Sequence, residues 1–150
     1  MFGFFKKKYP VLTADMFEPV DKEINTTEAK KLYKQYMKQI GYLEKDELSD
    51  HASYLADEIK ENEQYLKDDV ADKKSEIKDE KDRLKELKGK LKKANEDTKE
   101  DIEADIEDCQ QDIEYLNNDL EKETAELTKF KKDKRAFLIE YINNETQRSN

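Results

Sequence analysis

Residues 102–130 read IEADIEDCQQDIEYLNNDLEKETAELTKF, and apolar residues return in this stretch at alternating spacings of four and three. Extended to residue 141, the pattern forms two series whose members are seven residues apart. The series are Ile106, Ile113, Leu120, Leu127, Lys134 and Tyr141 at position a, and Ile102, Cys109, Leu116, Glu123, Phe130 and Phe137 at position d. Ten of these twelve residues are apolar, and a heptad repeat of this length is typical of a coiled coil.

The preceding part of the chain carries the same repeat. Its members are Ala56, Glu63, Val70, Ile77, Leu84 and Leu91 at a, and Ala52, Ile59, Leu66, Lys73, Glu80, Leu87 and Ala94 at d. Residues 92–99, KKANEDTK, separate the two halves, with basic residues before acidic ones as the two helix dipoles prefer. The sequence therefore predicts an all-α fold, a long antiparallel coiled-coil helical hairpin over residues 46–147. We expect helices over about residues 46–94 and 98–144, capped by Asp46 and Asp97, and a turn near residues 95–98.

The charges of the two halves also indicate a reversal near Asn95. Residues 96–121 contain twelve acidic residues and one lysine, whereas residues 78–93 contain eight basic and four acidic residues. The same reversal brings the acidic residues 57–69 beside the basic residues 129–135. It also places Lys73 near Glu123 and Glu63 near Lys134, while Glu80 is left without a partner. We interpret these two pairs as registry charges, because charged pairs in a seam disfavour wrong registers.

Residues 1–45 form a separate N-terminal segment with one short amphipathic helix over about residues 27–40. A capping hydroxyl at Thr26 or Thr27 begins this helix and Gly41 ends it. Its apolar face consists of Ala29, Leu32, Tyr33, Tyr36, Met37 and Ile40. Because residues 137–142 are apolar on more than one helical face, we expect this helix to pack at the open end of the hairpin.

The chain begins MFGFFKKKYP, with three aromatic residues directly before three basic ones. These residues are Phe2, Phe4, Phe5, Lys6, Lys7 and Lys8. Rings that enter a bilayer interface and lysines that meet anionic head groups suit a peripheral membrane contact, and the same cluster suits a protein partner. Packing of the rings against the open end of the hairpin is the alternative.

The composition limits both the core and the partners. Charged residues make up 45% of the chain and hydrophobic residues 35%, so the apolar material suffices for a seam and not for a rounded core. A net charge of -9 disfavours direct nucleic-acid binding and favours basic protein partners. A single cysteine, an N-terminus without a secretory pattern and the lack of a long apolar run predict a cytoplasmic protein, with a membrane-peripheral location as the alternative.

Residues with catalytic potential are isolated in the sequence. His51 is the only histidine and has no second ligand at metal-binding spacing. Cys109 occupies a d position beside Asp108 and Asp112, which are the opposite of the basic neighbours that activate a thiol. The chain has no glycine-rich phosphate loop, nucleophile elbow or zinc spacing. We therefore expect no enzyme activity, no cofactor and no metal site.

The acidic residues at the predicted tip form a candidate contact face. They are Glu96, Asp97, Glu100, Asp101, Glu103 and Asp105. The glycine and alternating oxygen ligands of a calcium loop are missing, so a solvated face that pairs with a partner is expected. The run continues well beyond the tip, to Glu121.

Three functions are compatible with these features. The first is a non-enzymatic bacterial or phage interaction protein, a monomeric hairpin or a homodimer, that uses the hairpin as a docking arm or spacer. It would contact a protein partner, a second copy or a membrane surface through its aromatic and basic N-terminus. The second is an acidic inhibitor that blocks a basic, nucleic-acid-binding site on an enzyme. The third is a polymerase-channel regulator, by architectural analogy with bacterial transcript-cleavage factors, which also carry carboxylates at the tip of a coiled-coil hairpin.

Overall fold

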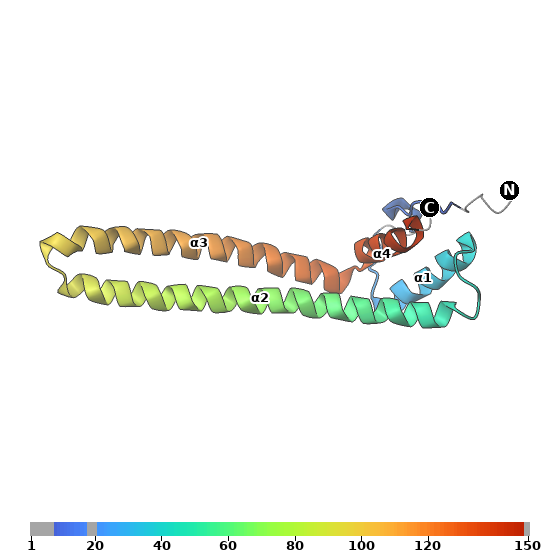
Figure 1. Ribbon diagram of the computed structural model, residues 1–150, viewed down its shortest axis with the longest axis horizontal. Helices are drawn as coiled ribbons and strands as arrows, with labels where there is room; N and C mark the ends of the chain where they lie inside the picture. The colour runs from blue at the N-terminus through green and yellow to red at the C-terminus, as the bar shows by residue number, and fades with distance from the viewer. Residues whose placement is uncertain (1–7, 18–20, 149–150) are drawn as a thin grey trace. The chain divides into compact units, whose positions relative to one another are not determined.

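The computed structural model describes residues 8–17 and 21–148. Its elements are the 3₁₀ turn η2 (Ala14–Met16) and the helices α1 (Thr26–Ile40), α2 (Leu48–Lys93), α3 (Glu96–Lys132) and α4 (Arg135–Gln147) (Figure 1). The described residues contain no strand, which confirms the all-helical class. Within these ranges, no helix combines the length and the apolar character that crossing a bilayer requires.

The chain divides into two compact units. The hairpin unit is Tyr65–Leu127, and the terminal unit comprises the described parts of Met1–Gln64 and Thr128–Asn150. Helices α2 and α3 each contribute residues to both units. The N-terminal helix α1 and the C-terminal helix α4 belong to the terminal unit.

In the hairpin unit, α2 and α3 pack side by side in opposite directions (Figure 1). Val70, Ile77, Leu87 and Cys109 are buried, and every other a or d residue of the unit is half-buried. Apart from the half-buried Asp69, all remaining residues of this unit are exposed. The buried surface is therefore a seam that follows the heptad positions.

The turn between α2 and α3 is shorter than the sequence predicts. Only Ala94 and Asn95 separate the two helices, and Asn95 takes the capping role that we assigned to Asp97. The Asn95 Oδ1 accepts hydrogen bonds from the backbone N and from the Oγ1 of Thr98, each at 3.1 Å. Because the short amide side chain satisfies these donors, α3 begins at Glu96 and Asp97 lies in its first turn.

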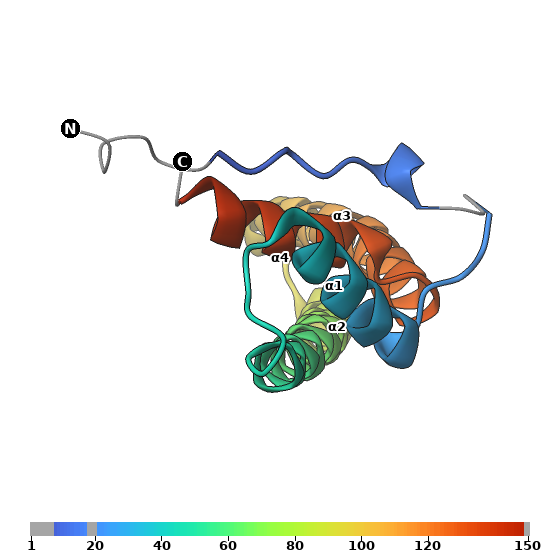
Figure 2. The ribbon, with the colours of Figure 1, turned by 90° about the vertical axis from the view of Figure 1, so that its right-hand side faces the viewer.

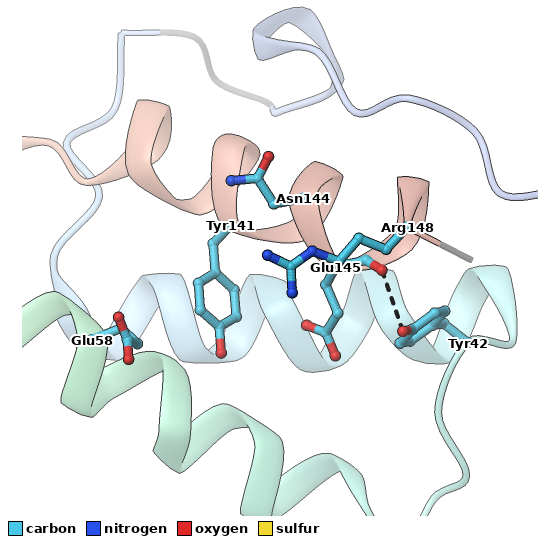
Figure 3. A pocket seen from close by; sticks show the side chains of 6 residues that line it. All are labelled: Tyr42, Glu58, Tyr141, Asn144, Glu145 and Arg148. Carbon is cyan, nitrogen blue, oxygen red and sulfur yellow. Dashed lines mark hydrogen bonds between the residues drawn. The ribbon is translucent and has the colours of Figure 1, made fainter. Parts of the chain in front are cut away.

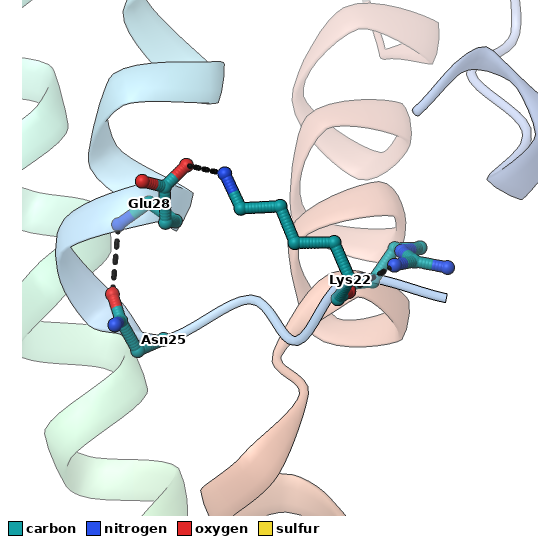
Figure 4. Close-up of polar contacts among 4 residues, drawn as sticks. Lys22, Asn25 and Glu28 are labelled. Carbon is teal, nitrogen blue, oxygen red and sulfur yellow. Dashed lines mark hydrogen bonds and ion pairs between the residues drawn. The ribbon is translucent and has the colours of Figure 1, made fainter. Parts of the chain in front are cut away.

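Helix α1 has a cap residue at each end, and Figure 4 shows the cap at its beginning. The Asn25 Oδ1 accepts a hydrogen bond from the Glu28 backbone N at 3.0 Å, so the cap is Asn25 and the expected threonine hydroxyl cap is wrong. Lys22 Nζ lies 3.3 Å from Glu28 Oε2. At the other end Gly41 has a φ of 69° and donates its N–H to the Lys38 carbonyl. Glycine adopts this left-handed conformation without steric cost, which explains the stop.

The terminal unit packs α1 and the segment before η2 against α4 (Figure 2). Leu12 N donates to Asn143 Oδ1 at 2.7 Å, and Asn143 Nδ2 donates back to the Leu12 carbonyl at 3.0 Å. The ring of Tyr33 on α1 meets the ring of Tyr141 on α4 with centroids 6.0 Å apart. The core of the unit consists of Leu12, Phe17, Ile24, Ala29, Tyr33, Met37, Leu48, Ala52, Leu55, Ile59, Phe130, Leu138 and Ile142.

The second long helix is interrupted at Asp133 and Lys134, where the sequence predicts an uninterrupted helix. The Lys134 backbone N donates to the carbonyl of Ile24 at 2.7 Å, so a distant segment replaces the helical acceptor. Asp133 Oδ1 accepts a hydrogen bond from the backbone N of Arg135, the first residue of α4, at 2.9 Å. Helix α2 also differs slightly, because residues 44–47 form a turn and the helix begins at Leu48 instead of residue 46.

Candidate interaction surfaces

A polar cluster surrounds Glu145 in the terminal unit. The Tyr33 hydroxyl donates to Glu145 Oε2 at 3.0 Å, and the Tyr42 hydroxyl donates to the Glu145 carbonyl at 3.3 Å. Burial and the adjacent Glu145 carboxylate raise the pKa of Tyr33 well above its usual range. His51 Nδ1 lies 3.6 Å from Glu145 Oε1, and this histidine is half-buried in the cluster.

An open pocket of about 470 Å³ adjoins this cluster (Figure 3). It is lined by Tyr42, Glu58, Tyr141, Asn144, Glu145 and Arg148. Burial, followed by the charges of Glu145 and Glu58, raises the pKa of Tyr141. The negative charges of Glu145 and Glu58 therefore disfavour ionisation of the Tyr141 hydroxyl.

A second hollow continues the first along α2 and α4. It shares Glu58, Tyr141 and Asn144 with the pocket and adds Asn62, Phe137 and Glu140. The rings of Phe137 and Tyr141 are stacked, with centroids 6.3 Å apart and an interplanar angle of 24°. We call the two hollows together the terminal groove. Its carboxylates and aromatic rings match the chemistry of positively charged side chains.

These groove residues come from two segments far apart in the sequence, and sequence analysis missed them. Tyr33 and Tyr42 gave a weak signal, because a hydroxyl on or near an apolar helix face usually has a buried acceptor. Nothing in the sequence indicated Glu145 as that acceptor. Throughout residues 8–17 and 21–148, His, Cys, Asp and Glu side chains do not gather in threes at metal-binding geometry.

Most of the candidate N-terminal contact lies outside the described residues. This applies to Phe2, Phe4, Phe5, Lys6 and Lys7, whereas Lys8 is described and exposed. Directly after it, the Tyr9 ring meets the Tyr42 ring edge-on at 4.9 Å. The described beginning of the chain therefore contacts a residue that lines the terminal groove.

The acidic candidate face lies on the first turns of α3. Glu96, Asp97, Glu100, Asp101, Glu103 and Asp105 are all exposed. In the described structure, none of these six carboxylates lies within ion-pair distance of a basic side chain. The face is thus open to a partner.

Two of the four registry charges are brought together. Lys73 Nζ lies 3.8 Å from Glu123 Oε1 and 4.0 Å from Asp119 Oδ2, across the seam of the hairpin unit. Lys134 instead donates its ammonium to the carbonyls of Phe130 and Lys131, at 3.3 and 3.0 Å. These carbonyls lose their helical partners at the end of α3, which explains why Lys134 serves them and not Glu63.

Cys109 is a buried seam residue with a hydrogen-bonded thiol. Its Sγ lies 3.2 Å from the Glu80 carbonyl oxygen and 3.4 Å from Glu80 Oε2. Burial, followed by the hydrogen bond to Glu80, raises the pKa of the thiol, so the nucleophilic thiolate is disfavoured. Glu80 also lies 3.6 Å from Arg83 Nη1, which gives this carboxylate the partners that the sequence did not reveal.

Comparison with known proteins adds no relative. No family model, curated protein or solved structure matches the chain.

Proposed function

We propose that the protein is a non-enzymatic interaction protein, in which α2 and α3 form an antiparallel coiled coil that serves as a docking arm or spacer. The burial pattern of the hairpin unit carries this proposal. The a and d residues are buried or half-buried, and the remaining side chains of the unit are exposed apart from Asp69. A helix pair of this kind has little interior to hold a substrate, and its long polar faces are available to partners.

The terminal unit supplies the second contact. The terminal groove is lined by three carboxylates, Glu58, Glu140 and Glu145, by one cation, Arg148, and by the stacked rings of Phe137 and Tyr141. We propose that a basic segment of a protein partner docks there. Contact with an anionic membrane surface through residues 1–8 is the alternative for the same end of the chain.

The coiled-coil hairpin is tested by disulfide formation. Leu87→Cys combined with Ile102→Cys, in a Cys109→Ala background, should give a crosslink within one chain, because both positions lie one heptad closer to the turn than Glu80 and Cys109, which contact each other across the seam. A chain carrying Leu87→Cys with Leu116→Cys is the matched control and should not crosslink internally. Crosslinks found only between chains would contradict the hairpin.

The contact surfaces are tested by affinity capture from the cells that produce the protein. Glu58→Gln with Glu140→Gln should lower the yield of the captured proteins several-fold, because each change removes a charge without changing the size of the side chain. Deletion of residues 1–8 should leave this yield unchanged if the groove carries the contact. If the deletion alone abolishes binding to phosphatidylserine-containing vesicles, the membrane alternative is favoured.

The acidic face supports a second candidate, an inhibitor that occupies a basic site on an enzyme. The observation in its favour is that the six exposed carboxylates of the first turns of α3 have no ion-pair partner in the described structure. Glu96→Gln, Asp97→Asn, Glu100→Gln and Asp101→Asn together should abolish such inhibition and leave capture through the terminal groove intact. Inhibition that also requires Mg²⁺ would point to the polymerase-channel regulator.

A further inference from the structure

Two stripes of opposite charge lie in the hairpin unit, one on α2 and one on α3. The lysine stripe on α2 consists of Lys81, Lys85, Lys88 and Lys92, and the glutamate stripe on α3 consists of Glu96, Glu100, Glu103 and Glu107. Both stripes follow the spacing four, three, four. All eight side chains are exposed, and in the described structure none of them forms an ion pair. The chain thus carries two complementary stripes that it does not use internally.

Both stripes occupy the same flank of the helix pair. Each stripe alternates between heptad positions e and b. Position e is held by Lys81, Lys88, Glu96 and Glu103, and position b by Lys85, Lys92, Glu100 and Glu107. In an antiparallel pair the e positions of the two helices lie on one side of the seam, and the g positions lie on the other. The opposite flank of α3 carries aspartates at c and g, namely Asp101, Asp105, Asp108 and Asp112. On α3, long and short carboxylates are therefore separated between the two flanks.

The lysine stripe borders an open hollow on α2. Leu84 and Gly89 complete its lining together with the four lysines. A Cβ added at Gly89 would meet no atom within 4 Å, so the packing of the chain itself does not require glycine at this helical position. Glycine lowers helix stability. Its presence in the hollow is explained if another helix approaches α2 there.

Apolar side chains on this flank are incompletely covered. Leu84, Leu91, Ile106 and Ile113 hold position a, which faces the e and b side of each helix, and all four are only half-buried. A second helix pair laid on this flank would remove their remaining surface from water. The flank therefore offers an apolar centre and a charged rim, which is the usual anatomy of a protein interface.

We propose that this flank is the interface between two copies of the chain, with the lysine stripe of one copy on the glutamate stripe of the other. This proposal rests on the coiled-coil hairpin proposed above and names one partner of it. A two-fold axis parallel to the helices places α2 of one copy beside α3 of the second copy in the antiparallel sense. Each copy then gives the same surface to the interface, and the assembly closes as a dimer.

The register observed within the chain fits this arrangement. Cys109 lies opposite Glu80 across the seam, and a two-fold axis along the helices preserves this level between copies. In this register each lysine of the stripe lies within one residue of the level of a glutamate of the second copy. The four pairs are Lys92 with Glu96, Lys88 with Glu100, Lys85 with Glu103, and Lys81 with Glu107. All four pairs match at once because both stripes share one spacing. On the opposite flank, Arg83 and Lys90 of α2 already form ion pairs within the chain, with Glu80 and Glu86, so no comparable free basic stripe faces the four aspartates.

The test is a charge reversal read by light scattering on the purified full-length chain. Wild-type protein at about 0.1 M salt should have twice the mass of the 17.8 kDa chain, and at about 1 M salt it should shift toward the single-chain mass. A first variant carries Lys81→Glu, Lys85→Glu, Lys88→Glu and Lys92→Glu, and a second carries Glu96→Lys, Glu100→Lys, Glu103→Lys and Glu107→Lys. Each should have the single-chain mass alone, and their mixture should recover the two-chain mass, because the reversed stripes complement each other.

A matched control carries Asp101→Lys, Asp105→Lys, Asp108→Lys and Asp112→Lys. It changes the net charge of α3 by the same amount as the second variant but on the opposite flank, and it should retain the two-chain mass. Far-ultraviolet circular dichroism should show the same helicity in all variants.

A single-chain mass for the wild type at both salt concentrations, or a mixture that does not recover the two-chain mass, would overturn the proposal. Wild type that binds duplex DNA while remaining a single chain would assign the lysine stripe to phosphates instead. None of these results would alter the intrachain disulfide test of the hairpin.

Discussion

The thiol of Cys109 on α3 donates a hydrogen bond to the backbone carbonyl of Glu80 on α2, with 3.2 Å between Sγ and the oxygen. This carbonyl already belongs to the backbone of a helix, so the contact ties the two helices at one level of the seam. The Glu80 carboxylate approaches the same sulfur at 3.4 Å. A fully buried side chain of small volume thereby combines apolar packing with a polar contact.

Replacement of Cys109 by alanine is expected to destabilise the chain. The change removes the sulfur from a fully buried site and leaves the Glu80 carboxylate without this donor. We expect a loss of about 1–2 kcal/mol in the free energy of unfolding, measured by urea denaturation. Ala104→Ser, at an exposed position of the same helix, should change stability by less than about 0.5 kcal/mol. Equal effects of the two substitutions would show that the Cys109 contact does not stabilise the seam.

Alkaline pH is expected to weaken the terminal unit through Tyr33. Its native pKa lies well above the usual range because the hydroxyl is buried and bonded to Glu145. In the unfolded chain the Tyr33 phenol titrates at pH ~10, so above that pH the unfolded state loses a proton that the native state keeps. The contribution of Tyr33 to the free energy of unfolding should be complete below pH ~10. Above that pH it should fall by about 1.4 kcal/mol per pH unit.

The measurement is urea denaturation at several pH values between about 8 and 11. Tyr33→Phe should be less stable than wild type at pH 8, because it loses the hydrogen bond to Glu145, and its stability should fall less steeply at high pH. Tyr65→Phe, at an exposed position of α2, should follow the wild-type curve. A slope that is unchanged in Tyr33→Phe would assign the alkaline loss to other groups.

The heptad pattern predicted the seam well because the forces that build it are local and periodic. From Leu66 to Leu127 each a or d residue is buried or half-buried, including Lys73, Glu80 and Glu123. The exposure of each position follows from helical geometry and from the neighbouring helix alone. The caps were less predictable, since adjacent residues such as Asn25 and Thr26 compete for one role.

Features that depend on distant segments were not predictable. The interruption at Lys134 requires the carbonyl of Ile24, which no periodicity near residue 134 reveals. The Tyr33 hydroxyl finds its acceptor 112 positions away in Glu145, and the terminal groove is likewise assembled from Tyr42, from α2 and from the C-terminal part of the chain at α4. Such contacts follow from how α1 and α4 pack, which a single sequence does not encode in a readable spacing.

The two glycines Gly41 and Gly89 are expected to respond in opposite directions to alanine. Gly41 has a φ of 69°, a conformation that alanine adopts only with strain, so Gly41→Ala should cost about 1 kcal/mol. Gly89 lies inside α2 with open space around the position of a Cβ, so Gly89→Ala should gain up to about 1 kcal/mol. Thermal unfolding at high salt, where association between copies is weakened, compares the two. A stabilising Gly41→Ala would contradict the left-handed cap.

Lys134 is expected to be far more important than its charged neighbours at the end of α3. Its backbone N–H is bonded to Ile24, and its ammonium serves the Phe130 and Lys131 carbonyls that the interruption leaves without helical partners. Lys134→Met keeps most of the apolar stem and removes these donors, and we expect a loss of about 1–3 kcal/mol measured by urea denaturation. Lys132→Met is the matched control, because Lys132 is exposed at the same helix end. If both variants lose the same stability, water replaces the lysine at these carbonyls and the interruption does not depend on it.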